Sequence, residues 1–126
     1  MTLFIEGLFS FLSKGGTSAG GRVYPLKLPQ GVTLPAIMYF QVSNPFEHSH
    51  DGASKLQHPR FQMDCWASTY LEAKTLANEL LELIDGYAGM MGAATVHAAF
   101  AEDERDNWDP DTGRHWVSVD VVIWNS

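Results

Sequence analysis

The period of the apolar positions changes within residues 60–77, from two to about 3.6. In residues 61–66 apolar and polar side chains alternate, which is typical of a strand. The alternation separates Phe61, Met63 and Cys65 from Gln62, Asp64 and Trp66. Next, Ser68-Thr69 offers a helix N-cap, Glu72 completes a capping box, and apolar residues recur at helical spacing over 73–84. We expect a strand that runs directly into an amphipathic helix, which ends at a glycine C-cap in Asp85-Gly86.

The N-terminal half predicts one helix and two strands. Residues 2–12 have apolar side chains on one side of a helix, and Gly7 within it costs about 1 kcal/mol relative to alanine. Packing must therefore hold this glycine in place. A short strand over 22–24 is ended by Pro25, and a continuously apolar strand is expected over 36–43.

The C-terminal part predicts a hairpin between residues 94–104 and 115–124. The second arm alternates, with Val117, Val119, Val121 and Ile123 on one face, and residues 109–113 have turn chemistry. The element order is then α-β-β-β-α-β-β. This order predicts a single α+β domain over residues 1–126, with a mainly antiparallel sheet and helices on one face.

Composition limits the class of protein. The chain has 126 residues, 45% of them apolar, and no apolar run long enough to span a membrane. Residues 1–12 lack a basic start, which argues against a signal peptide, and we expect a protein made in the cytoplasm. The single cysteine, Cys65, is expected to be a buried thiol.

Charge is distributed unevenly along the chain. Residues 1–60 contain five basic and three acidic groups (+2), and residues 61–126 contain three basic and twelve acidic groups (−9), which together give the net charge of −7. No Lys/Arg cluster is present, so specific binding of nucleic acid is disfavoured.

Two segments are candidate metal sites. His48, His50 and His58 lie with Asp51 in a polar connection over 44–58, but they have no recognisable zinc spacing and no cysteine joins them. The acidic segment 102–111 does not meet the spacing of an EF-hand. We expect no metal or other cofactor, and a solvated hairpin tip at 102–111 in which Trp108 is a candidate interface anchor.

Catalytic motifs are not recognisable in the sequence. Cys65 and the histidines fit no local nucleophile motif, and the Gly-Gly pairs lack the order of a phosphate-binding loop. The residues alone therefore predict a soluble α+β domain that is not an enzyme and has two long projecting connections.

Several short segments together resemble the tail completion, or tail terminator, proteins of long-tailed bacteriophages. In order along the chain they are GRVYP (21–25), PQG (29–31), PAIMY (35–39), QMDCWA (62–67), TYLEA (69–73) and DVVIW (120–124). The most specific block is the one that contains the strand-to-helix junction.

The resemblance implies a structural role in the virion. Family members form a closed ring, usually a hexamer, at the head-proximal end of the tail tube. The ring ends tube growth and docks to the head connector, so the implied partners are further copies of the chain, the tail tube protein and the connector protein. The resemblance transfers no catalytic residue. The protein would be made in the cytoplasm of a host bacterium and would function at the neck end of the tail.

Two projecting segments are the interface candidates: Phe46, Glu47, His48, His50 and Asp51, and Glu102, Asp103, Glu104, Arg105, Asp106 and Trp108. A ring needs two complementary patches per subunit, which the oppositely charged halves could supply. An acidic lining would let DNA pass through a channel without specific binding. The alternatives are another neck or head–tail joining protein, a monomeric adaptor, and a metal-dependent enzyme that uses His48, His50 and His58.

Overall fold

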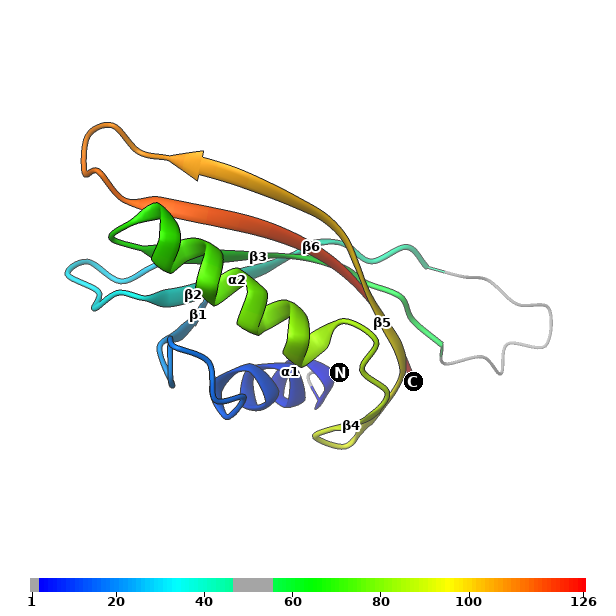
Figure 1. Cartoon of the computed structure of the whole chain (residues 1–126). Coiled ribbons are helices and arrows are strands. Elements are labelled where there is room, and N and C mark those ends of the chain that lie inside the picture. Colours follow the sequence, from blue (N-terminus) through cyan, green and yellow to red (C-terminus); the bar gives the residue numbers. More distant parts are fainter. Residues whose placement is uncertain (1–2, 47–55) are drawn as a thin grey trace.

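The computed structural model describes residues 3–46 and 56–126 (Figure 1). The two helices are α1 (Leu3–Ser13) and α2 (Tyr70–Ile84). The strands are β1 (Val23–Pro25), β2 (Ala36–Ser43), β3 (Arg60–Ala67), β4 (Gly89–Met91), β5 (Ala94–Trp108) and β6 (His115–Asn125). No helix in these two ranges is both long and apolar enough to span a membrane.

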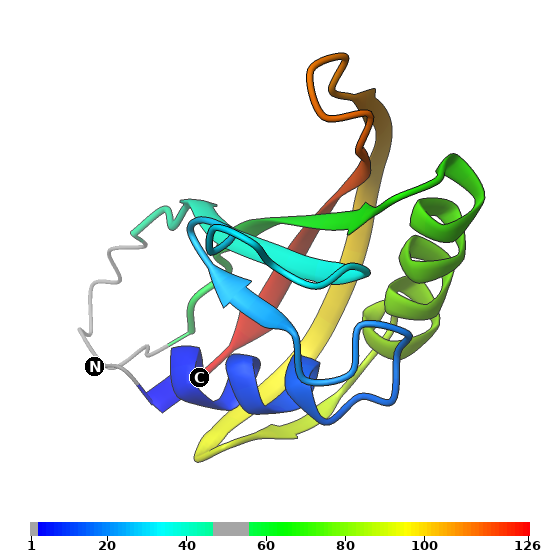
Figure 2. The same cartoon turned by 90° about the vertical axis from the view of Figure 1, so that its left-hand side faces the viewer.

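The six strands form one sheet in the order β1-β2-β3-β6-β5-β4. Strand β1 pairs with β2 in parallel, and every other pairing is antiparallel. Both helices lie on the same side of this curved sheet (Figure 2). The predicted α+β fold, with a mainly antiparallel sheet and helices on one face, is confirmed. The short strand β4 was not predicted.

The hydrophobic core lies between the sheet and the helices. It contains the inward side chains of β3 and β6, all at most 1% exposed: Phe61, Met63, Cys65, Val117, Val119, Val121 and Ile123. Leu8 and Leu12 of α1 and Leu76 and Leu80 of α2 complete it, each fully buried. The predicted alternation of β3 and β6 is therefore confirmed, because one face of each strand is buried against the helices.

Helix α2 has the predicted caps. The Thr69 hydroxyl accepts a hydrogen bond from the Glu72 backbone N–H at 3.2 Å and donates one to the Glu72 carboxylate at 3.0 Å. At the other end the Asp85 N–H donates to the Leu81 carbonyl at 2.9 Å, and Gly86 has a φ of 80°. A glycine at this left-handed position ends the helix without steric cost.

Gly7 explains how α1 sits against β4. A Cβ at this position would lie 2.2 Å from the carbonyl oxygen of Met91, so only glycine allows this close approach. The expectation that packing holds Gly7 in the helix is confirmed.

The acidic segment 102–108 differs from the prediction. The sequence ended the first strand at 104 and placed 102–111 in a solvated hairpin tip, but the strand continues to Trp108, which pairs with His115 of β6. The tip itself is shorter, and the Gly113 N–H donates to the Asp109 carbonyl at 2.8 Å within it. Side-chain partners from other elements hold the charged residues of β5 in the strand, as described next.

Candidate functional site

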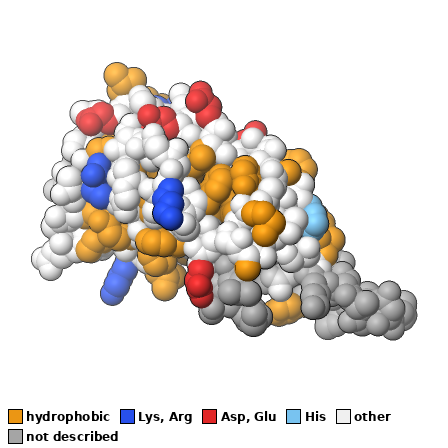
Figure 3. Space-filling model, turned by 90° about the horizontal axis from the view of Figure 1, so that it is seen from below, with side chains coloured by type: hydrophobic (Ala, Val, Ile, Leu, Met, Phe, Trp, Pro, Cys, Tyr) orange, Lys and Arg blue, Asp and Glu red, His pale blue; other side chains and the backbone are white. Residues whose placement is uncertain are grey.

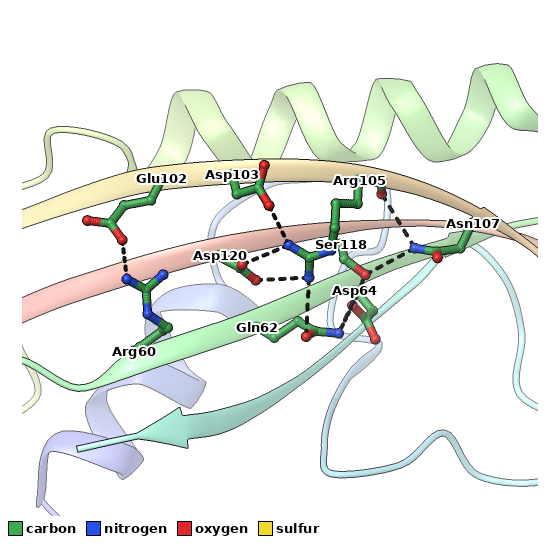
Figure 4. A network of polar contacts seen from close by, with 9 residues as sticks. All are labelled: Arg60, Gln62, Asp64, Glu102, Asp103, Arg105, Asn107, Ser118 and Asp120. Atoms are coloured by element: carbon green, nitrogen blue, oxygen red, sulfur yellow. Dashed lines mark hydrogen bonds and ion pairs between the residues drawn. The ribbon is translucent and has the colours of Figure 1, made fainter. Parts of the chain in front are cut away.

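The face of the sheet opposite the helices is lined by polar side chains in its centre. Alternation places Gln62 and Asp64 of β3 on this open face, opposite Asp120 and Ser118 of β6. Arg105 of β5 joins them from the next strand, so residues from three strands form one network (Figure 4). The sequence predicted that Gln62, Asp64 and Trp66 share a face, and neither α1 nor α2 covers it.

Arg105 is the cation at the centre of this network. Its Nη1 donates to Asp103 at 2.7 Å and to Asp120 at 2.8 Å, and its Nη2 donates to the second Asp120 oxygen at 3.2 Å. A bidentate contact of this kind fixes the geometry of both groups. The hydrogen bond from Arg105 holds the pKa of Asp103 below its usual value.

Asp64 is a buried carboxyl group on the otherwise open face, and it is 3% exposed. The Ser118 hydroxyl donates to its Oδ1 at 2.7 Å, and Gln62 Nε2 donates to the same oxygen at 3.0 Å. Burial raises the pKa of Asp64, while these two hydrogen bonds act in the opposite direction. Asn107 Nδ2 donates to the Ser118 hydroxyl at 3.3 Å, which links the same group to β5.

The other face of β5 is tied to α2. Lys74 forms ion pairs with Glu104 and with Asp106, the latter at 3.1 Å. The Tyr70 hydroxyl donates to Asp106 at 2.8 Å, and this hydrogen bond, followed by that from Lys74, lowers the pKa of Asp106. The negative charges of Glu104 and Asp106 are thus partly neutralised by Lys74 of α2.

The predicted interface residues fall into three groups. Glu102 to Asp106 lie together on β5, where Glu102 also pairs with Arg60 of β3. Trp108 and Phe46 are 59% and 79% exposed, so both offer apolar surface. Glu47, His48, His50 and Asp51 lie outside the described residues.

Among residues 3–46 and 56–126 the candidate metal ligands form no cluster and the candidate thiol is buried. Within 3–46 and 56–126 no group of three His, Cys, Asp or Glu side chains could hold a metal ion. The ring of His58 stacks on Trp124, with centroids 4.3 Å apart. The Cys65 thiol is fully buried, and burial raises its pKa, so it is not an available nucleophile. The described surface carries ion pairs, hydrogen bonds and ring stacking.

Sequence reasoning missed two apolar features of the surface. One is an open hollow of about 540 Å³ lined by Leu56, His97, Ala98, Phe100 and Trp124. The other is Leu26, which is 76% exposed and has a φ of 71°. The alternation of β6 placed Trp124 on the open face, but nothing in the sequence indicated that Phe100 and Leu56 lie beside it.

The two edges of the sheet differ in charge. Residues 7–46, which include β1 and β2 at one edge, contain three basic groups and no acidic one. Residues 101–111, in the β5 arm near the other edge, contain six acidic groups and one basic group. Seen from the side of α1, most of the acidic side chains lie along one border and the basic ones in a different region (Figure 3). The separation is incomplete, because Arg60 of β3 pairs with Glu102 of β5.

Comparison with known proteins identifies the family. The profile of the family "Tail completion protein gp17" matches residues 10–126. A chain from the solved structure "Virion of native gene transfer agent (GTA) particle" has the same fold, with a TM-score of 0.67 and 10% sequence identity over 98% of this chain and 93% of that chain. A comparison with curated proteins gave no match. The matched residues 10–126 include all six strands, and therefore the side chains of both faces of the sheet. The chain belongs to the tail completion protein gp17 family.

Proposed function

We propose that this protein caps the head-proximal end of the tail tube as a closed ring, ends tube growth and forms the surface to which the head connector docks. The family match over residues 10–126 carries the proposal. Membership makes the chain a structural protein of the virion tail, in a family of structural proteins and not of enzymes, and a tail component associates with other virion proteins.

The charge distribution supports a head-to-tail arrangement of copies. A cyclic ring needs two different patches on each subunit that fit one another. Arg22 and Lys27, which flank β1, and the acidic residues of β5 are the candidate pair, because three strands separate β1 from β5 in the sheet. Electrostatic attraction between them would favour the correct orientation and faster encounter more than raw affinity.

A second part of the proposal concerns the DNA channel. An acidic lining repels the phosphates of DNA, so DNA would slide through the ring without binding. Reversing the charge of Asp103, Glu104 and Asp106 should therefore impair assembly or DNA passage. These carboxylates also pair with Arg105 and Lys74, so circular dichroism of the variant must first show that it folds. Normal infectivity of a folded triple variant would remove this part of the proposal.

The mass of the protein in solution tests the ring. Light scattering over a wide concentration range, at two salt strengths, should show a monomer that converts to one discrete larger species. Higher salt should weaken the conversion, because salt screens exposed charges. The same measurement with added tail tubes that lack this protein would detect a ring that forms only on the end of a tube. A monomer that neither self-associates nor binds the tubes would contradict the proposal.

A further inference from the structure

The two outermost strands of the sheet, β1 and β4, have occupied backbone edges. In β1 the Val23 N–H donates to a carbonyl of the preceding turn at 2.9 Å, and Pro25 has no N–H. The Pro25 carbonyl accepts the Lys27 N–H at 2.9 Å. In β4 the Met90 carbonyl accepts the Tyr87 hydroxyl at 2.7 Å. Groups that are already bonded in this way discourage pairing with another chain.

The long strand β5 has a covered part and an open part along its outer edge. Strand β4 pairs with β5 only over residues 94–96 (Figure 1). Farther along, the Ala99 carbonyl accepts the Gly86 N–H at 2.8 Å, and the Asp85 carboxylate accepts the Ala101 N–H at 2.9 Å. From there to the end of β5, no backbone group of the described residues pairs with the outer edge.

The backbone groups that point outward from this open part follow from the pairing of β6. The Ile123 and Asn125 N–H groups bond toward the β3 side, so odd-numbered residues of β6 face β3 and even-numbered ones face β5. The even-numbered residues of β6 lie opposite positions 103, 105 and 107 of β5. The residues of β5 that turn their N–H and C=O groups outward are therefore Glu104, Asp106 and Trp108.

The carboxylates at this edge are bonded over the helix face. Lys74 of α2 pairs with both Glu104 and Asp106, and the Tyr70 hydroxyl donates to Asp106 at 2.8 Å. The outward backbone groups remain, and a row of N–H and C=O groups is complementary to an extended backbone segment. The chemistry of this edge therefore specifies an added strand.

A second copy of β5 does not fit as that strand. Antiparallel self-pairing would place Asp106 opposite either Glu104 or Asp106 of the other copy. The two carboxylates of each copy share the single cation of Lys74, so surfaces of like net charge would meet. Like charges directly opposite one another destabilise a strand pair.

Strand β2 carries a free outward position just beyond β1. The Tyr39 carbonyl accepts the Leu26 N–H at 2.9 Å, and Gln41 faces the same way two residues later. Among the residues that the structure describes, Gln41 has no backbone partner on that side, and residues 40–43 carry no charge. Strands β2 and β5 run in opposite directions, because each pairing between them in the sheet is antiparallel.

We propose that β2 of one copy pairs through Gln41 with the open edge of β5 at Asp106 of the next copy, so that the two sheets become continuous. This inference rests on the proposed ring and names the contact that closes it. Within one copy, β3 and β6 separate these two strands, so the pairing has to join two copies. With the helices of both copies on the same face the pairing is antiparallel, and repeated head-to-tail contact generates a ring if it closes.

Cysteine cross-linking tests the contact directly. The double variant Gln41→Cys with Asp106→Cys should form disulfide-linked oligomers on oxidation, because directly paired residues have Cα atoms about 5.5 Å apart. The native Cys65 is fully buried and stays out of the reaction. The matched control is Gln41→Cys with Arg105→Cys. It should give no linked species, because the Arg105 side chain lies on the open face.

A proline variant separates the backbone contact from the side-chain contacts. Asp106→Pro removes an N–H that points outward, which an edge strand tolerates. Asp106→Ala removes the same carboxylate and keeps the N–H, so the two variants should have similar melting temperatures. Self-association of Asp106→Pro, alone or on tail tubes, should be about two- to tenfold weaker than that of Asp106→Ala, the effect of one lost hydrogen bond.

The outcomes distinguish this contact from the ring itself. A ring that forms in Asp106→Pro as readily as in Asp106→Ala, or without the Gln41–Asp106 cross-link, would overturn the contact and leave the ring standing. If Asp106→Pro loses tube binding but keeps self-association, the edge belongs to the tube protein and the contact is also overturned. If Asp106→Pro does not fold, the cross-link alone decides. Absence of any self-association, alone or on tubes, would overturn both proposals.

Discussion

The two faces of strands β3 and β6 carry different kinds of side chain, apolar on one face and polar on the other. On the helix side, Phe61, Met63 and Val119 are at most 1% exposed and pack into the core. On the open side the intervening positions carry Gln62 and Asp120, which bond across strands to Arg105. The difference shows that the period-two pattern separates two environments, because one face packs into the core and the other carries a polar network.

The largest expected effect is on the covered face. Met63→Ala should lower the free energy of unfolding by about 2–5 kcal/mol, because it leaves a cavity in a fully buried site. Met90→Ala is the matched control, since Met90 is 57% exposed, and it should cost about 0.5 kcal/mol or less. Urea denaturation measures both. Equal costs for the two methionines would contradict the assignment of the core to the helix side.

The cap of α2 is the next test, because this helix closes the covered face. Thr69→Ala removes the acceptor for the Glu72 N–H and should lower the free energy of unfolding by about 1 kcal/mol. Thr75→Ala, at an exposed position within the same helix, should be nearly neutral, since alanine is the better helix former. Urea denaturation measures both variants. If Thr75→Ala lowers the free energy of unfolding as much as Thr69→Ala does, the cap is not the cause.

On the open face a smaller effect is expected from the central cation. Arg105→Ala should lower the free energy of unfolding by about 0.5–1 kcal/mol, because its pairs with Asp103 and Asp120 are partly exposed to solvent. Arg114→Ala is the control in the same hairpin, where no ion pair forms with the described residues, and it should change little. A loss that disappears in 1 M salt for Arg105→Ala would support the electrostatic origin. An identical loss for both arginines would contradict the network.

Asp64 gives the smallest effect, and it depends on pH. Burial raises the pKa of Asp64 in the folded protein, so the folded state binds this proton more tightly than the unfolded chain. The contribution of Asp64 to stability is then fully present below its unfolded pKa and is lost as the pH rises through the folded value. Asp64→Asn keeps an oxygen acceptor for Ser118 and Gln62 but has no charge to bury.

The stability of Asp64→Asn relative to the unmodified chain should therefore be highest at pH 7 and fall as the pH is lowered toward 4. Urea unfolding of both proteins at several pH values measures this difference. A difference that stays constant, or one that grows as the pH falls, would show that burial does not control the ionisation of Asp64.

Local signals predicted the elements that depend on neighbouring residues. The Thr69 cap, the Gly86 end of α2 and the bounds of β2 were read correctly, because each rests on side chains within a few positions. The first arm of the hairpin was predicted to end at residue 104, and its continuation over 105–108 was wrongly assigned to the hairpin tip. Its charged residues are held in the strand by Lys74 and Arg60, which come from α2 and β3, and sequence spacing does not reveal such partners.

The candidate surface was predictable only in part. Trp108 and the acidic residues of β5 were named from the sequence, whereas the hollow was not, because Leu56, Phe100 and Trp124 come from three separate segments. The left-handed backbone of Leu26 also had no local signal, since the position is occupied by a residue that disfavours it. Both features arise from tertiary structure.

Tube growth in vitro tests the central claim most directly. Purified tail tube protein is polymerised from tail tips with and without this chain, and tube lengths are measured by electron microscopy. If the chain is a terminator, tubes stop growing when it is added and carry it as a ring at the end that would face the head. Tubes that continue to grow at the same rate, with no density at that end, would contradict it.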